Sequence, residues 1–285
     1  MARNSGYGSG RMVTRSFYAA LADYHVHTPL CRHAEGTPAE LARAAAALGL
    51  AEIGFSDHSP MPQFFDDWRM LLEELPQYLE AVEEARTACP QIAIRLGLEV
   101  DYIPGMEGWL EELSQKADWD YLIGSVHYIA PGWDVDNPKH LSRYNDRPLE
   151  EIWELYFTHY IRAIRTRAFD FMAHPDLPKK FGHRPQCDMK RWFEPTVAAL
   201  AETGTAFEIN TAGLRKPVGE CYPELRFLQM AREAGVPLLI NSDAHAPGEV
   251  GAGFEEAVAL AKAAGYTSLL RFEKRKRREV PLPEH

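Results

Sequence analysis

The chain has 285 residues, of which 46% are apolar and 25% are charged. These values are close to the globular average and exclude a disordered or collagen-like chain. The formal net charge of −10 argues against nucleic acid as a partner, because non-specific nucleic-acid binding needs a basic surface. The one basic run, residues 274–278, is interpreted as a solvated end, with a docking patch as the alternative.

The cysteines and the N-terminal residues indicate the compartment. The four cysteines are far apart and form no Cys-x-x-Cys pair, which argues against a zinc ribbon or a thioredoxin-like site. Free thiols in a reducing cytosol are the simplest interpretation, and no segment has the pattern of a secretory signal or a membrane span. The sequence therefore predicts a cytoplasmic protein without a membrane partner. Residues 1–18 are expected to be a disordered lead-in, and residues 19–285 a single barrel domain.

Short apolar runs alternate with helical patterns from about residue 20 onward. The runs predict strands at residues 21–26, 52–56, 92–100, 121–126, 169–173, 206–210 and 237–242, with a weaker eighth at 267–272. Helices are expected at residues 37–49, 76–89, 107–117, 148–167, 188–203, 223–234 and 254–264. Strict alternation predicts a parallel sheet, and seven or eight such units favour a closed α/β barrel. A doubly wound open sheet is the competitor, but no Gly-x-Gly-x-x-Gly follows the first expected strand.

In a parallel barrel the active site lies at the C-terminal ends of the strands. Five of the seven expected strand ends carry histidine, and two carry a carboxylate that can join them; with His33 from the first loop, the candidate metal ligands are His25, His27, His33, His58, Glu99, His127, His174, Asp243 and His245. Because alternate strand residues point to the same side, His25 and His27 can face one ion. Nine ligands are too many for one tetrahedral zinc and indicate a cluster of two or three ions.

The order and type of these residues resemble the PHP (polymerase and histidinol phosphatase) superfamily over nearly the whole chain after residue 20. The matching strings are His25-Val-His27, Cys-Arg-His33, Ser-Asp57-His58, Gly-Leu-Glu99, Gly-Ser-Val-His127, Ala-His174-Pro, Asn210-Thr-Ala-Gly and Ser-Asp243-Ala-His245. The amidohydrolases share His-x-His, but they need a mid-barrel lysine where the third expected strand offers Glu99. Longer strings, including Asn-Thr-Ala-Gly-Leu-Arg215, resemble the histidinol-phosphate phosphatase branch in particular.

The resemblance implies a distorted (β/α)7 TIM-like barrel with three divalent ions at the C-terminal ends of its strands. The first ion would be held by His25, His27, Glu99 and Asp243, the second by Glu99, His127 and His174, and the third by His33, His58 and His245. Imidazole and carboxylate ligands suit zinc, iron or manganese alike, so the ligand types do not fix the metals.

A cluster of divalent ions would attract a phosphate group and lower the pKa of bound water, which makes a hydroxide nucleophile available at neutral pH. Arg215, five residues after Asn210, is a candidate phosphate-binding and catalytic residue because a guanidinium binds phosphate through two parallel hydrogen bonds. Lys179 and Lys180 are further candidates for the phosphate. Asp57 is a candidate for orienting a ligand imidazole or protonating the leaving group. Acidic loop residues, Glu35 among them, are candidates for the cationic part of the substrate.

The resemblance implies a histidinol-phosphatase. Such an enzyme is a metal-dependent phosphomonoesterase that hydrolyses L-histidinol phosphate to L-histidinol and phosphate in histidine biosynthesis, through a metal-bridging hydroxide. The alternative with the same site is a nucleotide phosphoesterase or exonuclease of the superfamily. A third hypothesis is a metal-stabilised regulatory module without activity. The expected partner is a small phosphate monoester, and a homo-oligomer is left open.

Overall fold

The structure is a computed structural model that describes residues 15–284. The first helix, α1 (Arg15–Ala19), begins inside the segment expected to be a disordered lead-in, and Phe17 is buried in the core. The rest of that segment, residues 1–14, lies outside the described residues. All four cysteines are free, as the sequence predicted. Among residues 15–284, every helix is too short or too polar to cross a membrane.

Seven parallel strands form the central sheet, in the order β1-β2-β3-β4-β7-β8-β9. Their bounds are β1 (Ala22–Asp23), β2 (Glu52–Phe55), β3 (Ala93–Asp101), β4 (Tyr121–Ser125), β7 (Phe171–Met172), β8 (Ala206–Asn210) and β9 (Leu238–Asn241). Backbone hydrogen bonds from His27 N to Ala244 O (2.9 Å) and from Ala244 N to His25 O (3.1 Å) join the segment after β9 to the segment after β1. The sheet is therefore a nearly closed barrel, and the expected α/β barrel of seven strands is confirmed.

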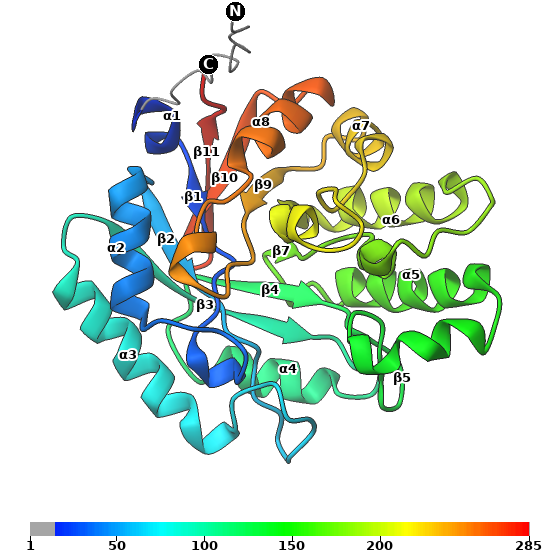
Figure 1. The fold of residues 1–285 in the computed structure, drawn as a ribbon, viewed down its shortest axis with the longest axis horizontal. Coiled ribbons are helices and arrows are strands. Elements are labelled where there is room, and N and C mark those ends of the chain that lie inside the picture. The colour runs from blue at the N-terminus through cyan, green and yellow to red at the C-terminus, as the bar shows by residue number, and fades with distance from the viewer. Residues whose placement is uncertain (1–14, 285) are drawn as a thin grey trace, which may run out of the picture.

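Helices connect the strands and surround the barrel (Figure 1). Their bounds are α2 (Pro38–Leu48), α3 (Leu75–Ala88), α4 (Glu107–Ser114), α5 (Leu149–Thr166), α6 (Lys190–Thr203), α7 (Leu225–Glu233) and α8 (Phe254–Ala263). The capping signals act as predicted: Thr37 and Glu40 form the capping box of α2, and Gly49 ends it with a φ of +89°. The seven expected helices are confirmed, each within two or three residues of its predicted bounds.

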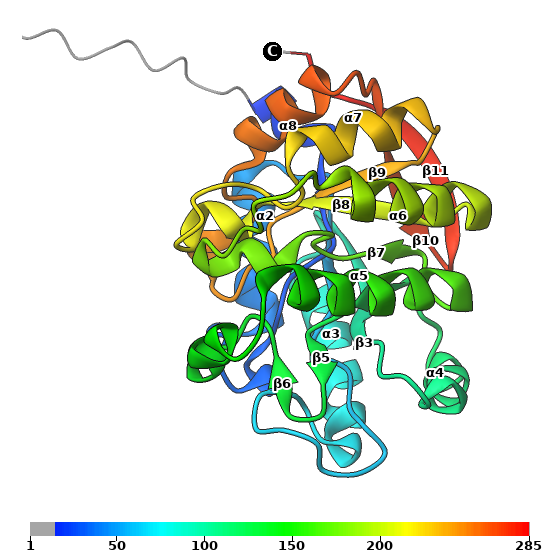
Figure 2. The same cartoon turned by 90° about the vertical axis from the view of Figure 1, so that its right-hand side faces the viewer.

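The eighth apolar run does not extend the parallel sheet. It forms β10 (Ser268–Glu273), which pairs antiparallel with β11 (Lys276–Pro281) in a separate hairpin. Leu270 and Phe272 of this hairpin pack against aromatic residues inside the barrel. Figure 2 shows the hairpin along one side of the molecule, away from the short hairpin of β5 (Tyr128–Ala130) and β6 (Trp133–Asp134), which the sequence did not predict.

Residues 274–278 are exposed, as expected for a solvated basic run, but they do not form a free end of the chain. They form the turn and the beginning of β11, and two of their side chains bind acidic residues of the barrel. Arg275 Nε lies 2.5 Å from Asp170 Oδ2, and Arg278 Nη2 lies 2.6 Å from Glu52 Oε1. The hairpin brings the positive charges to carboxylates that lie far away in the sequence.

The ring of Tyr121 is fully buried in the barrel interior, where it packs with other apolar residues such as Tyr24 and Phe171. A Cβ on Gly97 would lie 2.3 Å from this ring, and a Cβ on Gly54 would lie 2.3 Å from its hydroxyl oxygen, so both positions need glycine. The hydroxyl of Tyr121 donates to the backbone oxygens of Tyr24 (2.6 Å) and Phe55 (3.1 Å), at the ends of two other strands. Tyr121 therefore joins several strands directly below the residues expected to bind metal.

Candidate metal centre

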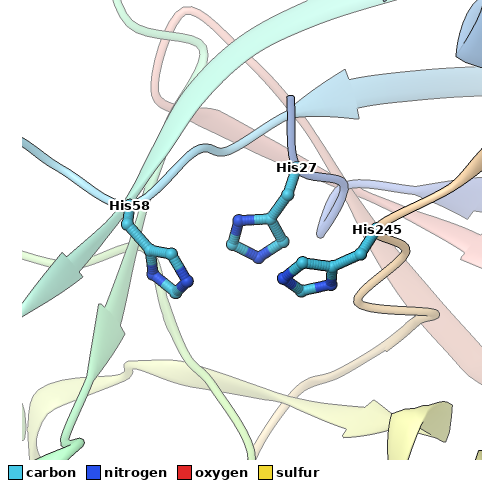
Figure 3. Close-up of side chains that lie close together, drawn as sticks. All are labelled: His27, His58 and His245. Carbon is cyan, nitrogen blue, oxygen red and sulfur yellow. The ribbon is translucent and has the colours of Figure 1, made fainter. Parts of the chain in front are cut away.

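The structure brings the nine predicted ligands together at one end of the barrel. Glu99 lies within β3, and the others follow β1, β2, β4, β7 and β9 or, for His33, a short 3-10 helix after β1 (Pro29–Cys31). Figure 3 shows His27, His58 and His245, which come from three different loops, pointing into one space. Parallel strands end at the same side of a barrel, and this explains why residues more than two hundred positions apart in the chain meet.

Glu99 lies in the middle of the histidines. Its carboxylate oxygens are between 2.8 and 3.6 Å from nitrogens of five imidazoles, which belong to His25, His27, His58, His127 and His174. All six side chains are buried. Burial raises the pKa of Glu99, but the surrounding imidazoles outweigh it and hold the pKa well below its usual range. The centre of the site thus contains an ionised carboxylate whose ion-pair partners among residues 15–284 are all histidines.

Three further ligands lie nearer to the solvent. Asp243 Oδ1 is 3.3 Å from His27 Nε2 and 3.7 Å from His25 Nε2, and its side chain is 17% exposed. The Nε2 atoms of His33 and His245 face each other at 3.0 Å. The ligand set therefore extends from the buried Glu99 to the mouth of the barrel.

Two buried carboxylates that the sequence prediction missed orient ligand imidazoles. Glu208 accepts from His25 Nδ1 (3.0 Å), and Asp101 accepts from His127 Nδ1 (2.8 Å). Each contact leaves Nε2 of the ring directed towards Glu99, which is the arrangement that metal-binding histidines adopt. A sequence signal was present: Asp101 follows Glu99 by two residues on β3, and Glu208 precedes Asn210 by two residues on β8, so each pair shares one face of its strand.

Two of the ligands have a left-handed backbone, which is unfavourable for residues other than glycine. The φ of His174 is +23° and that of Asp243 is +53°. Contacts from neighbouring elements hold both: Tyr156 donates to His174 O (2.8 Å), and Arg215 Nη2 donates to Asp243 O (3.2 Å). The fold keeps these ligands in positions that the isolated chain would avoid.

The donor set fits divalent ions. His25 Nε2 and His27 Nε2 are buried without a hydrogen-bond partner among the described residues, which is rare unless a polar atom has another ligand. Several groups of three donors lie within 4.8 Å of one another, among them His25, His27 and Glu99, and His58, Glu99 and His127. His58 lies with Glu99 and His127 as well as with His27 and His245, so the groups overlap and do not reproduce the implied division into three ion sites.

A cavity of about 310 Å³ lies over these residues. It is continuous with a second cavity between the loop after β2 and the 3-10 helix Pro138–Asn145, because both are lined by His33, His58, His127, Asp136 and Lys180. Trp68 and Asp67 line the second cavity, and Lys216 lines the first. The site thus has room for a ligand larger than a phosphate ion.

The predicted phosphate-binding lysines differ sharply in position. Lys180 lines the cavity and binds Asp136 Oδ2 at 2.9 Å, and its charge outweighs the effect of burial and lowers the pKa of Asp136 to about 2. Lys179 is 0% exposed, and its Nζ binds Asp176 Oδ2 (2.9 Å) and Cys221 O (2.8 Å) inside the protein. Lys179 therefore does not reach the cavity, and the prediction that it binds phosphate is wrong in this structure.

Arg215, Asp57 and Glu35 do not line either cavity. Arg215 Nη2 donates to Ser242 O (2.8 Å), while its Nη1 is buried without a hydrogen-bond partner among the described residues. Asp57 is fully buried, and its Oδ1 lies 3.5 Å from His27 Nδ1, a contact that suits orienting the ring. Glu35 is exposed, and its backbone N–H donates to His245 O (2.7 Å).

Lys216 is a residue that the sequence prediction missed. It lines the cavity, is exposed, and has no ion-pair partner among the described residues. It directly follows Arg215, the predicted phosphate-binding residue.

Comparison with known proteins identifies the family. The PHP domain profile matches residues 23–212. The chain belongs to the PHP domain family. Among its relatives, a Deinococcus radiodurans protein named "Probable histidinol-phosphatase" is 44% identical over 245 residues, which cover 84% of this chain and 91% of that protein. The histidinol-phosphatase of Bacillus subtilis is 29% identical over 265 residues, which cover 82% and 96%.

A solved structure has the same fold as this PHP domain protein. It is the histidinol phosphate phosphatase of Lactococcus lactis complexed with zinc, L-histidinol and phosphate, with a TM-score of 0.73 and 21% sequence identity. The match covers 91% of this chain and 99% of that one. The distorted barrel expected from the resemblance is therefore confirmed.

Proposed function

We propose that this PHP domain protein hydrolyses L-histidinol phosphate to L-histidinol and phosphate. The observation that carries the proposal is the convergence of seven histidines and Asp243 around Glu99, beneath a cavity that Lys180 and Lys216 also line. The names of its relatives support the substrate, and the solved Lactococcus lactis enzyme was obtained with zinc, L-histidinol and phosphate.

The residues present would hold a cluster of divalent ions, which we propose to be three, drawn from zinc, iron and manganese. Such ions supply a Lewis acid for phosphoryl oxygens and make water more acidic. Glu99 is the proposed bridging ligand because its two oxygens face different histidines: Oε1 faces His174 (3.0 Å), and Oε2 faces His58 (2.8 Å). Asp243 would contribute the second negative charge near the mouth.

The chain's own cations would bind the phosphate group at the solvent side of these ligands. Lys180 is held in the cavity by Asp136, and Lys216 lies in the same cavity without an ion-pair partner among residues 15–284. Lysine ammonium groups bind phosphate as point charges. The organic part of the substrate would extend into the adjoining cavity, where Trp68 offers an apolar surface and Asp67 a negative charge for the cationic amine.

Phosphate release from histidinol phosphate, measured beside a panel of nucleoside monophosphates and a short oligonucleotide, tests the proposal. We expect kcat/KM to be highest for histidinol phosphate. A preference for nucleotides would replace the proposal by the nucleotide phosphoesterase alternative. Release from no substrate, by protein that retains its metals, would favour a regulatory module.

The two neighbouring cations Arg215 and Lys216 should behave differently when changed to alanine. Lys216→Ala should leave metal content unchanged and lower kcat/KM by roughly tenfold, since one charge-assisted hydrogen bond contributes about 1.5 kcal/mol. Arg215→Ala should lower metal content as well, because Arg215 donates to the backbone oxygens of Ser242 and Asp243. Steady-state kinetics and elemental analysis of the same preparations check both. Normal metal content in Arg215→Ala, together with a raised KM, would instead support Arg215 as the phosphate-binding residue.

A further inference from the structure

Arg69 is a buried cation, and it is not among the predicted site residues. It lies in the loop between β2 and α3 and is only 3% exposed. Its guanidinium makes three kinds of contact: Nε donates to Asp66 Oδ2 (2.7 Å), Nη1 to Ser59 O (3.2 Å) and Nη2 to Asp101 Oδ2 (2.9 Å). A planar group with five donors can make such contacts at once, whereas an ammonium cannot match their directions.

The contact with Asp101 connects Arg69 to the candidate metal ligands. Asp101 binds Arg69 with one oxygen and His127 with the other, since its Oδ1 accepts from His127 Nδ1 (2.8 Å) and from His127 N (3.1 Å). The carboxylate is buried and is therefore held by these contacts and not by water. The direction of the His127 ring, and of its Nε2 towards Glu99, thus depends on where Arg69 holds Asp101.

The contacts with Asp66 and Trp68 connect Arg69 to the wall of the second cavity. Asp66 accepts from Arg69, from the hydroxyl of Tyr128 (2.8 Å) and, at Oδ1, from the backbone N–H of Trp68 (3.2 Å), and the guanidinium lies 4.5 Å from the centre of the Trp68 ring. The Trp68 ring contacts His58 edge-on at 4.5 Å and His127 at 5.5 Å, and it is parallel to Tyr128 at 6.0 Å. Trp68 therefore contacts two candidate ligands and, beside them, lines the cavity that would receive the organic part of a substrate.

We propose that Arg69 is a positioning residue that sets the substrate wall and a metal ligand together. It fixes Trp68 through Asp66 and fixes His127 through Asp101. One guanidinium therefore holds the cavity wall at a fixed position relative to the metal centre. The inference about the cavity wall and the substrate rests on the proposed function. The inference about the metal ligand His127 does not depend on that function. Without Arg69, the buried Asp101 and the half-buried Asp66 would lose their shared counter-charge, and both attachments would loosen.

Three variants separate the two attachments. Arg69→Met removes both, while Arg69→Lys keeps the charge but not the geometry of three contacts. Asp66→Asn weakens only the attachment to the wall. Arg95→Met is the matched control, since Arg95 is a half-buried arginine that also lies between two carboxylates, Glu52 (2.8 Å) and Glu273 (2.7 Å), away from the cavities. Each protein is assayed for metal content, for melting temperature, and for kinetics on histidinol phosphate and on phenyl phosphate.

Arg69→Met should weaken metal retention by roughly 10–100-fold, the range found for residues that orient metal ligands, and should raise KM for histidinol phosphate more than KM for phenyl phosphate. Arg69→Lys should recover part of both. Asp66→Asn should shift the KM ratio severalfold with metal content unchanged. Arg95→Met should lower only the melting temperature.

Arg69→Met or Arg69→Lys with full metal content and an unchanged KM ratio would overturn the inference, as would an Arg95→Met protein with the same losses. The kinetics of the unchanged protein test the proposed function separately: if it does not hydrolyse histidinol phosphate, the metal content of the Arg69 variants still decides the link to His127. Should Arg69→Met fail to fold, Arg69→Lys and Asp66→Asn carry the same test.

Discussion

Glu99→Gln is expected to remove most of the bound metal and to lower turnover of histidinol phosphate by more than about 100-fold, because even residues that only orient ligands contribute 10–100-fold. The amide has the shape of the carboxylate but no charge, and it can present only one oxygen. The carboxylate oxygens of Glu99 face imidazoles on both sides, including His58 at 2.8 Å and His174 at 3.0 Å. An amide there would direct an NH2 group at one of these sets of nitrogens.

Elemental analysis and steady-state kinetics on the same preparation check this expectation. Glu52→Gln is the matched control, since Glu52 is also a buried glutamate but binds Arg95 and Arg278 at the opposite end of the barrel. We expect the control to be less stable and to keep its metals and activity. A Glu99→Gln protein with normal metal content and turnover would mean that Glu99 is not the bridge and that the cluster is organised around another carboxylate.

Prolonged incubation with a strong chelator should abolish activity and also lower the melting temperature. The candidate ligands follow or lie in six of the seven barrel strands, so bound ions would link most of the barrel and stabilise the folded state by mass action. A single ion present at a hundred times its dissociation constant contributes about 2.7 kcal/mol, which corresponds to a shift of roughly 5–10 °C.

Thermal unfolding and phosphate release, followed before chelation, after it and after return of zinc, manganese or iron, check this second expectation. The metal that restores most activity also indicates the native ion. Full activity after exhaustive metal removal would contradict the metal-dependent mechanism. Loss of activity with an unchanged melting temperature would mean that the ions act in the reaction but do not stabilise the barrel.

The fold was largely predictable because the signals involved are local. Seven apolar runs and the capping residues between them gave strands and helices close to their observed bounds, as for β8 (Ala206–Asn210), whose bounds match the expectation. The β10–β11 hairpin was not predictable in this way. Its partners, such as Glu52 and Asp170, lie far from it in the sequence, and a basic run next to a C-terminus has the same local pattern whether or not it pairs.

Neighbouring residues with similar chemistry limited how far the site could be predicted from the sequence. Lys179 and Lys180 are indistinguishable by residue type, yet one ammonium is buried against Asp176 and the other lies in the cavity. Both lysines lie in a 3-10 helix (Leu177–Phe181), and the orientation of this helix depends on the packing of the barrel. Arg215 and Lys216 are also neighbouring cations, and only Lys216 lines the cavity.

The sequence alone determined that nine candidate ligands would meet, because parallel strands end on the same side of a barrel and each candidate follows or lies in an apolar run. Only the tertiary structure decided what surrounds them. Glu208, Asp101 and Arg69 are polar residues whose effect depends on which imidazole or carboxylate lies within about 3 Å. A hydrogen bond depends on distance and direction between atoms from different elements, and the order of residues along the chain specifies neither.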